Sequence, residues 1–306
     1  MKYSVVIPVF NSESIVRETV DRTVSFFRKS RLDFELILVN DGSSDKSWDV
    51  IKEKAEKYQE VISINLLRNY GQHVANLCGF RHATGDYIIT MDDDLQNPPE
   101  EIQKLIAKAT EGYDLVLGRF KEKKHTFLRR IGSRVVGLIN RKIFHGQKGL
   151  VLTNFRIIRR DVIERVCRYK TGYPYIPGLV LMFSTRRANV LVEHHERSVG
   201  TSNYNFWRIT KLVSELLFNY SAYPLRLVAG IGLLAAMLSL GFSVYYFLSS
   251  TIYGTSVPGW TTVVVLLSFF NGIMLLVLGM LGEYLVRLIN QSSYAESYHI
   301  QDIVSE

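Results

Sequence analysis

Short runs of apolar, mostly β-branched residues alternate with segments in which apolar positions recur at helical spacing. The runs are nearly continuous in Val, Ile and Leu, which predicts buried strands at 3–9, 34–40, 61–67, 86–92 and 114–119. The segments between them predict helices near 13–30, 45–58, 71–83 and 98–111. This alternation predicts an α/β domain with a largely parallel sheet.

The C-terminal third has a different pattern, because no charged side chain occurs between Arg226 and Glu283. Two apolar stretches, at about 226–249 and 261–285, each exceed the roughly 20 helical residues that cross a bilayer. The segment that joins them carries Trp260 and no Lys or Arg. Basic residues lie near the outer ends, at Arg208, Lys211, Arg226 and Arg287.

Two transmembrane helices with both termini in the cytoplasm follow from this charge distribution. The alternative, a helical hairpin buried in a soluble core, is less favoured because uncharged stretches of this length are rare outside membranes. Residues 206–223 place apolar positions on one side of a helix, with Arg208 and Lys211 elsewhere, which favours a helix in the membrane interface over a core helix. The predicted organisation is a catalytic domain at 1–205, the interfacial helix at 206–223, the two spans within 224–288 and a cytoplasmic tail at 289–306.

Composition narrows the partners and the compartment. The net charge of +8 favours nucleic acid, anionic lipid or phosphorylated ligands without choosing among them. Cys78 and Cys167 stand alone, so neither a disulfide framework nor a zinc site is expected, and a reducing cytosol fits. The N-terminus begins with a strand pattern, and no signal peptide is expected.

Polar groups follow four of the predicted strands, as "NSE", "NDGSSD", "RNYGQ" and "DDDLQ". Ligands of parallel sheets collect at the carboxyl ends of the strands. Adjacent carboxylates repel each other, which makes the "DDDLQ" segment costly unless a cation binds there. Asp92, Asp94 and the Gln96 amide are hard oxygen ligands suited to Mg²⁺ or Mn²⁺, which share their remaining positions with substrate phosphates.

Taken together, the motifs of this chain resemble those of one enzyme family. "VVIPVFNSE", "LVNDGSSD", "LLRNYGQ", "GDYIITMDDDLQNPPE" and "ERSVGTSNY" resemble the family 2 glycosyltransferases of GT-A fold, in particular the polyprenyl-phosphate glycosyltransferases. The resemblance covers nearly the whole chain. It implies a Rossmann-like GT-A domain that transfers a sugar from a nucleotide sugar, most simply a UDP-sugar, to a polyprenyl phosphate such as undecaprenyl phosphate. The transfer would invert the anomeric configuration of the sugar. It also implies the inner membrane as location and a homo-oligomer, possibly a tetramer.

The resemblance further implies residue roles. Pro8, Phe10 and Asp41 would line the nucleotide base pocket, although "NDGSSD" would also make a good turn and helix cap. Asp92 and Asp94 would be the DxD pair, with Gln96 as a further metal ligand. The remaining nucleotide-sugar contacts would come from Ser12, Gly42, Arg68, Gln72, Asp93, Asn154, Arg156 and Ser202.

Arginine suits the acceptor phosphate because its planar fork of donors matches the oxygens. By resemblance, Arg119 and one of Arg129, Arg130 and Arg134, taken as Arg130, would bind that phosphate, and Arg197 would lie near the diphosphate. For any single member of the Arg129–Arg134 group, contact with anionic headgroups is an equally good interpretation.

Several positions depart from the family pattern. Asn154 stands where many relatives have an acidic residue, Asn203 and Gln72 replace lysines, and Ser12 replaces a glutamate. A phosphate nucleophile is already largely ionised at pH 7, since its second pKa is about 6, so the missing base is tolerated. We therefore expect Asn154 and Arg156 to contact the sugar.

Three alternatives remain open. A processive polysaccharide synthase is disfavoured because no QxxRW motif precedes any of the three tryptophans. A catalytically silent scaffold that binds nucleotide sugar or lipid phosphate is kept open by the substitutions at Asn154, Asn203 and Gln72. A nucleic-acid binder fits the charge alone, but its basic residues are not arranged with aromatics on one face.

Overall fold

The computed structural model describes residues 1–120, 137–195, 206–221, 259–292 and 298–305, with 223, 224, 226–228, 230–232, 234, 237, 238, 241 and 252. The chain forms two compact units. One comprises Met1–Thr210 with Ala295–Glu306, and the other comprises Lys211–Tyr294.

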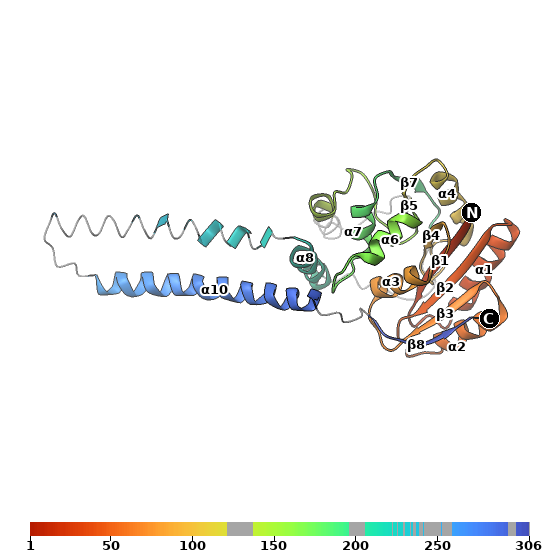
Figure 1. The fold of residues 1–306 in the computed structure, drawn as a ribbon, viewed down its shortest axis with the longest axis horizontal. Helices are drawn as coiled ribbons and strands as arrows, with labels where there is room; N and C mark the ends of the chain where they lie inside the picture. The colour runs from red at the N-terminus through yellow and green to blue at the C-terminus, as the bar shows by residue number, and fades with distance from the viewer. Residues whose placement is uncertain are drawn as a thin grey trace. The chain divides into compact units, whose positions relative to one another are not determined.

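Within the described residues, eight strands of the first unit form one sheet in the order β7-β5-β6-β4-β1-β2-β3-β8 (Figure 1). Its strands are β1 (Lys2–Val9), β2 (Asp33–Asn40), β3 (Val61–Leu66), β4 (Tyr87–Thr90), β5 (Leu115–Arg119), β6 (Arg156–Arg159), β7 (Arg187–Leu191) and β8 (Ile300–Val304). The five strands predicted from apolar runs are therefore confirmed.

Helices cover both faces of the sheet. One face carries α1 (Val16–Lys29), α2 (Ser47–Lys57), the short turn η1 (Pro99–Glu101) and α4 (Ile102–Ala109). The opposite face carries α3 (Gln72–His82), α6 (Arg160–Arg168) and α7 (Ile176–Phe183). The helix α3 lies so close to β1 that a Cβ at Gly79 would stand 2.3 Å from a methyl of Val6. The predicted α/β architecture is confirmed.

Strand direction decides which residues meet. The neighbours β4, β1, β2 and β3 are parallel, whereas β6 runs antiparallel to both β4 and β5. The carboxyl ends of β1 to β5 therefore share an edge with the beginning of β6. Because Thr90 pairs with Arg156, the residues just after β4 face those just before β6.

The strand β8 was not predicted from the sequence. It pairs antiparallel with β3, from Ser63 opposite Val304 to Leu66 opposite Ile300 (Figure 1). Tyr298, just before the strand, is 6% exposed, and the Arg81 guanidinium lies over its ring at 5.3 Å from the centroid. The C-terminal segment is therefore an edge strand of the sheet.

The second unit contains most of α8 (Phe206–Tyr220) and all of α10 (Trp260–Ser292). Within it, the Tyr284 hydroxyl donates a hydrogen bond to the Ser221 carbonyl at 3.3 Å. Among the described residues, no helix combines the length and apolarity of a membrane span. The transmembrane hairpin is not confirmed, and most of its first predicted span lies outside the described residues.

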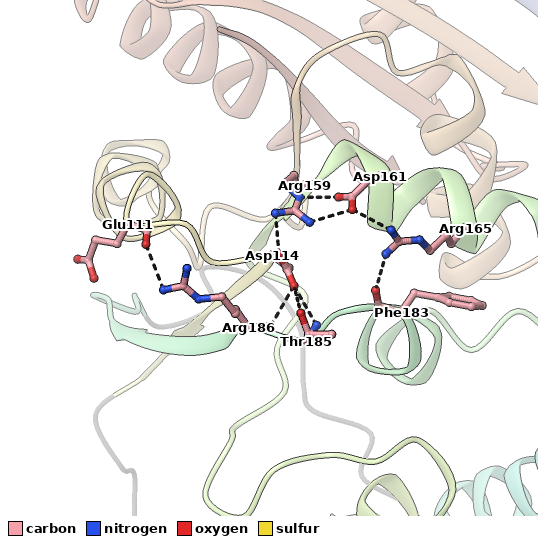
Figure 2. Close-up of polar contacts among 8 residues, drawn as sticks. All are labelled: Glu111, Asp114, Arg159, Asp161, Arg165, Phe183, Thr185 and Arg186. Atoms are coloured by element: carbon pink, nitrogen blue, oxygen red, sulfur yellow. Dashed lines mark hydrogen bonds and ion pairs between the residues drawn. The ribbon is translucent and has the colours of Figure 1, made fainter.

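A polar network around Asp114, the residue before β5, connects the beginning of β5 to β6 and to the residues that lead into β7 (Figure 2). Asp114 Oδ2 accepts hydrogen bonds from the backbone N–H groups of Thr185 and Arg186 at 2.9 and 3.0 Å. Its Oδ1 lies 2.9 Å from Arg159 Nη1, and Arg159 also binds Asp161 at 2.6 Å. Burial would raise the pKa of Asp114, but these backbone bonds and Arg159 hold that pKa below its ordinary value.

Replacing Asp114 with alanine should lower the free energy of unfolding at neutral pH by about 2–4 kcal/mol, because several donors lose the carboxylate that accepts their hydrogen bonds. The folded-state pKa is depressed, so the stabilisation is present above the unfolded pKa of about 3.9 and disappears as the pH falls through the lower folded value. Urea unfolding of Asp114→Ala at pH 7 and near pH 3 tests this, with exposed Asp33→Ala as control. If Asp114→Ala lost the same free energy of unfolding at both pH values, the electrostatic explanation would be wrong.

Candidate active site

Two amides converge on one oxygen of Asp92, in the loop that follows β4. Asn154 Nδ2 donates to Asp92 Oδ1 at 2.6 Å, and Gln72 Nε2 donates to the same oxygen at 2.7 Å. Burial raises the pKa of Asp92, partly offset by the Asn154 hydrogen bond. The two amides therefore fix the position of one oxygen of the Asp92 carboxylate.

Asp93 lies on a different side of the loop. Its Oδ2 accepts hydrogen bonds from the Ser12 hydroxyl and, at 3.3 Å, from the Phe10 backbone N–H. Burial raises the pKa of Asp93 to about 6. Asp93 therefore joins the end of β4 to the loop after β1.

The backbone after Asp94 is held in an unusual conformation. Leu95 has a φ of 55°, which is uncommon for a residue with a side chain. The Gln96 N–H donates to Asp94 Oδ1 at 3.2 Å, and the Gln96 carbonyl accepts from the His195 N–H at 2.9 Å. A strained turn at a polar strand end indicates a functional constraint.

The acidic loop, residues 92–96, offers oxygen ligands of the kind that a divalent cation takes. Among the described residues, no group of three or more His, Cys, Asp or Glu side chains is arranged to hold a metal. The predicted set comprises two carboxylates and an amide, which is compatible with a Mg²⁺ or Mn²⁺ that takes its other ligands from substrate phosphates and water. Burial raises the pKa of Asp92 and Asp93, and so does repulsion from the neighbouring carboxylates, Asp94 for the first and both Asp92 and Asp94 for the second. A bound cation would relieve that repulsion.

Asp41, at the end of β2, holds the turn that begins α3. Its Oδ1 accepts from the Tyr70 N–H at 2.7 Å and its Oδ2 from the Gly71 N–H at 2.9 Å. Burial raises the pKa of Asp41, against the effect of these two bonds. The next residue, Gly42, has a φ of 65°, and a Cβ there would lie 2.4 Å from the backbone of Arg68. Both residues thus bring the ends of β2 and β3 together, and their contact with a nucleotide stays a prediction.

The other predicted base-pocket residues lie along the same edge of the sheet. Pro8 is buried within β1, whereas Phe10 is 48% exposed just beyond it. Arg68 is exposed, and its guanidinium lies over the Tyr70 ring at 5.1 Å from the centroid. An exposed aromatic ring and a basic side chain at this edge are compatible with a nucleotide.

Arg156 is fully buried at the start of β6. Its Nε donates to Thr90 Oγ1 at 3.1 Å and its Nη2 to Asn154 Oδ1 at 3.2 Å. Asn154 therefore links the Arg156 guanidinium to the Asp92 carboxylate. The structure brings these three residues together, and their contact with a sugar stays a prediction.

The predicted phosphate-binding arginines are only partly described. Arg119 is exposed at the carboxyl end of β5. Arg130, Arg197 and Ser202 lie outside the described residues.

Three polar residues near Arg156 were missed by the sequence analysis. His73 follows Gln72 in α3, Asn140 lies in a helical stretch at 137–143, and Tyr175 directly precedes α7. Burial and the nearby Arg156 lower the pKa of His73 to about 4, so its imidazole is neutral at pH 7. Their spacing in the sequence gives no signal that they lie together, because the three residues come from separate segments of the chain.

Comparisons with known proteins identify the family of the chain. The family described as glycosyl transferase family 2 matches residues 4–167. Undecaprenyl-phosphate 4-deoxy-4-formamido-L-arabinose transferase of Proteus mirabilis (strain HI4320) is 36% identical over 306 residues, which cover 99% of this chain and 94% of the relative. The protein of that name from Photorhabdus laumondii is 35% identical over 308 residues, which cover 100% and 95%.

A solved structure shows the same fold. Glucosyl-3-phosphoglycerate synthase from Mycobacterium tuberculosis, in complex with Mn²⁺, UDP and phosphoglyceric acid, is 17% identical with a TM-score of 0.51. The match covers 71% of this chain and 76% of that chain. It confirms the α/β glycosyltransferase fold that the sequence motifs predicted.

Proposed function

The chain belongs to glycosyl transferase family 2, and from this premise we propose that it transfers a sugar from a nucleotide donor to undecaprenyl phosphate. The observation that carries the proposal is the similarity over nearly the full chain to transferases named for that acceptor. Their sugar, 4-deoxy-4-formamido-L-arabinose, is the donor sugar we propose here. The product would serve the modification of a cell-envelope glycan.

The acidic loop would bind the donor diphosphate through a divalent cation. We assign Asp92 Oδ2, Asp94 and the Gln96 amide to a divalent cation, which when bound stabilises the charge that develops on the leaving diphosphate. Gln72 and Asn154 orient Asp92 by donating to its other oxygen. Phe10 and Arg68 lie where they could contact the nucleotide, and UDP is the nucleotide we propose.

The acceptor needs no general base from the protein. A phosphate oxygen of the acceptor forms a bond to the anomeric carbon of the sugar from the side opposite the diphosphate. The bond from that carbon to the diphosphate oxygen breaks, its electron pair leaves with the nucleoside diphosphate, and the anomeric configuration inverts. The amide of Asn154 cannot accept a proton as a carboxylate would, and an ionised phosphate makes this unnecessary. Arg119 and Arg130 would neutralise the acceptor phosphate, and Arg197 would lie near the diphosphate.

A membrane location also belongs to this proposal. The described side chains on α10 include exposed Leu267, Met274, Leu278 and Leu285. Contact with lipid would remove this apolar surface from water and bring the site to a lipid-borne phosphate. The two-span topology, the cytoplasmic orientation of the catalytic unit and the homo-oligomer stay predictions.

Asn154→Asp should lower the transfer rate roughly 10- to 100-fold, because a donor to Asp92 becomes a like charge beside a metal-binding carboxylate. Kinetics at several Mn²⁺ concentrations with an accepted donor measure the effect. Adding Gln72→Lys places a cation on the same Asp92 oxygen, which Gln72 reaches at 2.7 Å, and should recover part of the loss. An unchanged rate and donor preference in Asn154→Asp would remove Asn154 from the site.

The direct test is transfer of label from a panel of radiolabelled nucleotide sugars into organic-extractable lipid. The assay contains the purified chain, undecaprenyl phosphate and Mn²⁺ or Mg²⁺, with EDTA as control. A lipid product that EDTA abolishes is the expected result and identifies the sugar. Nucleotide binding without product from any donor would favour the silent scaffold.

A further inference from the structure

The stretch 192–195, which follows β7, runs beside the acidic loop and the turn η1 that comes after it. The Val192 N–H donates to the carbonyl of the last residue of β5 at 3.0 Å, and the Val192 side chain is part of the core. The N–H groups of Glu193 and His195, two residues apart, both donate to the segment at 96–101. The stretch is therefore held from two sides after the strand has ended.

One of these bonds is accepted by a side chain rather than by the backbone. The Glu193 N–H donates to Glu101 Oε2 at 2.9 Å. The Glu101 side chain is 11% exposed, and its carboxylate also binds Lys104 Nζ at 2.7 Å. The Glu101 N–H donates to the Pro98 carbonyl at 3.0 Å, next to two prolines that restrict the backbone. A carboxylate in a fixed place thus supplies the acceptor that a neighbouring strand would otherwise provide.

The second bond is accepted by Gln96, whose side-chain amide is assigned to the cation. The Gln96 carbonyl accepts from the His195 N–H at 2.9 Å, and the Gln96 N–H donates to Asp94 Oδ1 at 3.2 Å. The preceding residue, Leu95, has a φ of 55°, which few residues with a side chain adopt. Because the backbone sets the direction in which a side chain leaves it, the position of His195 helps to decide where the Gln96 amide points.

Glu101 and Gln96 are therefore connected through residues 193–195. Without the carboxylate, the Glu193 N–H would turn to water, and the stretch that ends at His195 could move away from η1. The Gln96 carbonyl would follow its donor or lose it. Mg²⁺ requires nearly ideal octahedral geometry, so a small displacement of one ligand weakens its binding.

We propose that Glu101 is a positioning residue: its carboxylate holds residues 193–195 against the acidic loop and thereby keeps Gln96 in place as a ligand of the divalent cation. The proposal rests on the proposed function, because the cation is the one that the donor diphosphate shares. Glu101 is assigned neither to the cation nor to a substrate. Its contribution depends on the reach of its side chain and not on its negative charge.

Two conservative substitutions separate reach from charge. Glu101→Asp keeps the negative charge but shortens the side chain by one methylene group, which withdraws the oxygen from the Glu193 N–H. Glu101→Gln keeps the length and an oxygen that can accept this hydrogen bond, but it removes the charge. A positioning role predicts that the first substitution weakens Mn²⁺ binding and that the second does not.

Calorimetric titration of Mn²⁺ into the full chain in detergent, with UDP present, measures the effect without turnover. Glu101→Asp should raise the dissociation constant of Mn²⁺ about three- to tenfold, below the roughly 10- to 100-fold effect of a group that bonds a metal ligand directly. Glu101→Gln should stay within about twofold of the unaltered chain, because an amide oxygen replaces the carboxylate oxygen as acceptor. The affinity for UDP without Mn²⁺ reports whether each variant retains a folded nucleotide site.

Glu100→Asp and Glu100→Gln are the matched controls. Glu100 is the adjacent residue of η1, and its carboxylate binds Arg22 at 2.8 Å on the surface. Both controls should leave the affinity for Mn²⁺ unchanged, although each repeats a change made at Glu101. A weaker affinity in Glu100→Gln as large as that in Glu101→Asp would show a general charge effect and overturn the proposal.

Two further results would overturn the positioning role while leaving the transferase standing. One is an unchanged affinity for Mn²⁺ in Glu101→Asp, and the other is a loss in Glu101→Gln that equals or exceeds the loss in Glu101→Asp. If the unaltered chain bound UDP with no effect of Mn²⁺, the assignment of the acidic loop to a cation would be wrong, and the role of Glu101 with it. Label transfer to undecaprenyl phosphate decides separately whether the proposed function holds.

Discussion

Asp94→Ala should reduce kcat/KM for sugar transfer by about 10³-fold or more. Asp94 and Asp92 are the carboxylates assigned to the cation on the diphosphate, and loss of such a ligand removes stabilisation of the leaving group in the transition state. Label transfer to undecaprenyl phosphate with the preferred donor measures the loss. Calorimetry with UDP and Mn²⁺ should show weakened metal-dependent binding in the same variant.

Asp93→Asn is the matched control for this experiment. Asp93 accepts hydrogen bonds from the Ser12 hydroxyl and the Phe10 N–H and is not assigned to the cation. Its replacement should therefore lower kcat/KM roughly tenfold or less. If Asp94→Ala transferred sugar as well as the unaltered chain, the assignment of the acidic loop would be wrong. If Asp94→Ala kept the cellular role of the protein, the scaffold interpretation would be favoured.

Ending the chain after residue 297 should lower the free energy of unfolding of the first unit by about 3–5 kcal/mol, from loss of a buried aromatic ring and of backbone hydrogen bonds. Tyr298 is 6% exposed, and β8 pairs with β3 over Ile300–Val304. The His299 carbonyl also accepts from the Leu67 N–H at 3.0 Å, next to the turn that Asp41 holds. A weaker affinity for UDP should accompany the loss of stability.

Thermal unfolding and UDP titration of the truncated chain measure both effects. Removing only residues 305 and 306, which follow β8, is the control and should leave the melting temperature nearly unchanged. Equal melting temperatures for the full and truncated chains would show that the pairing of β8 with β3 contributes nothing to stability.

Much of the fold follows from local pattern. The run at 34–40 predicted β2 at Asp33–Asn40, and the segment at 71–83 predicted α3 at Gln72–His82. Burial on both faces of a parallel sheet requires continuous apolar strands, and this requirement is visible in any short window of the sequence. The strand β8 was missed because its residues, "IQDIV", carry no such run, and its partner β3 lies more than two hundred residues earlier in the chain.

The sequence by itself determined the family, the strand ends that carry polar groups and the acidic loop, because each is written in contiguous residues. Only the tertiary structure decided that Gln72 and Asn154 share one oxygen of Asp92, since this depends on β6 running antiparallel beside β4. The same holds for His73, Asn140 and Arg156, which are distant in sequence. Contacts across a sheet depend on strand order and register, and these are set by the packing of the whole domain rather than by any local pattern.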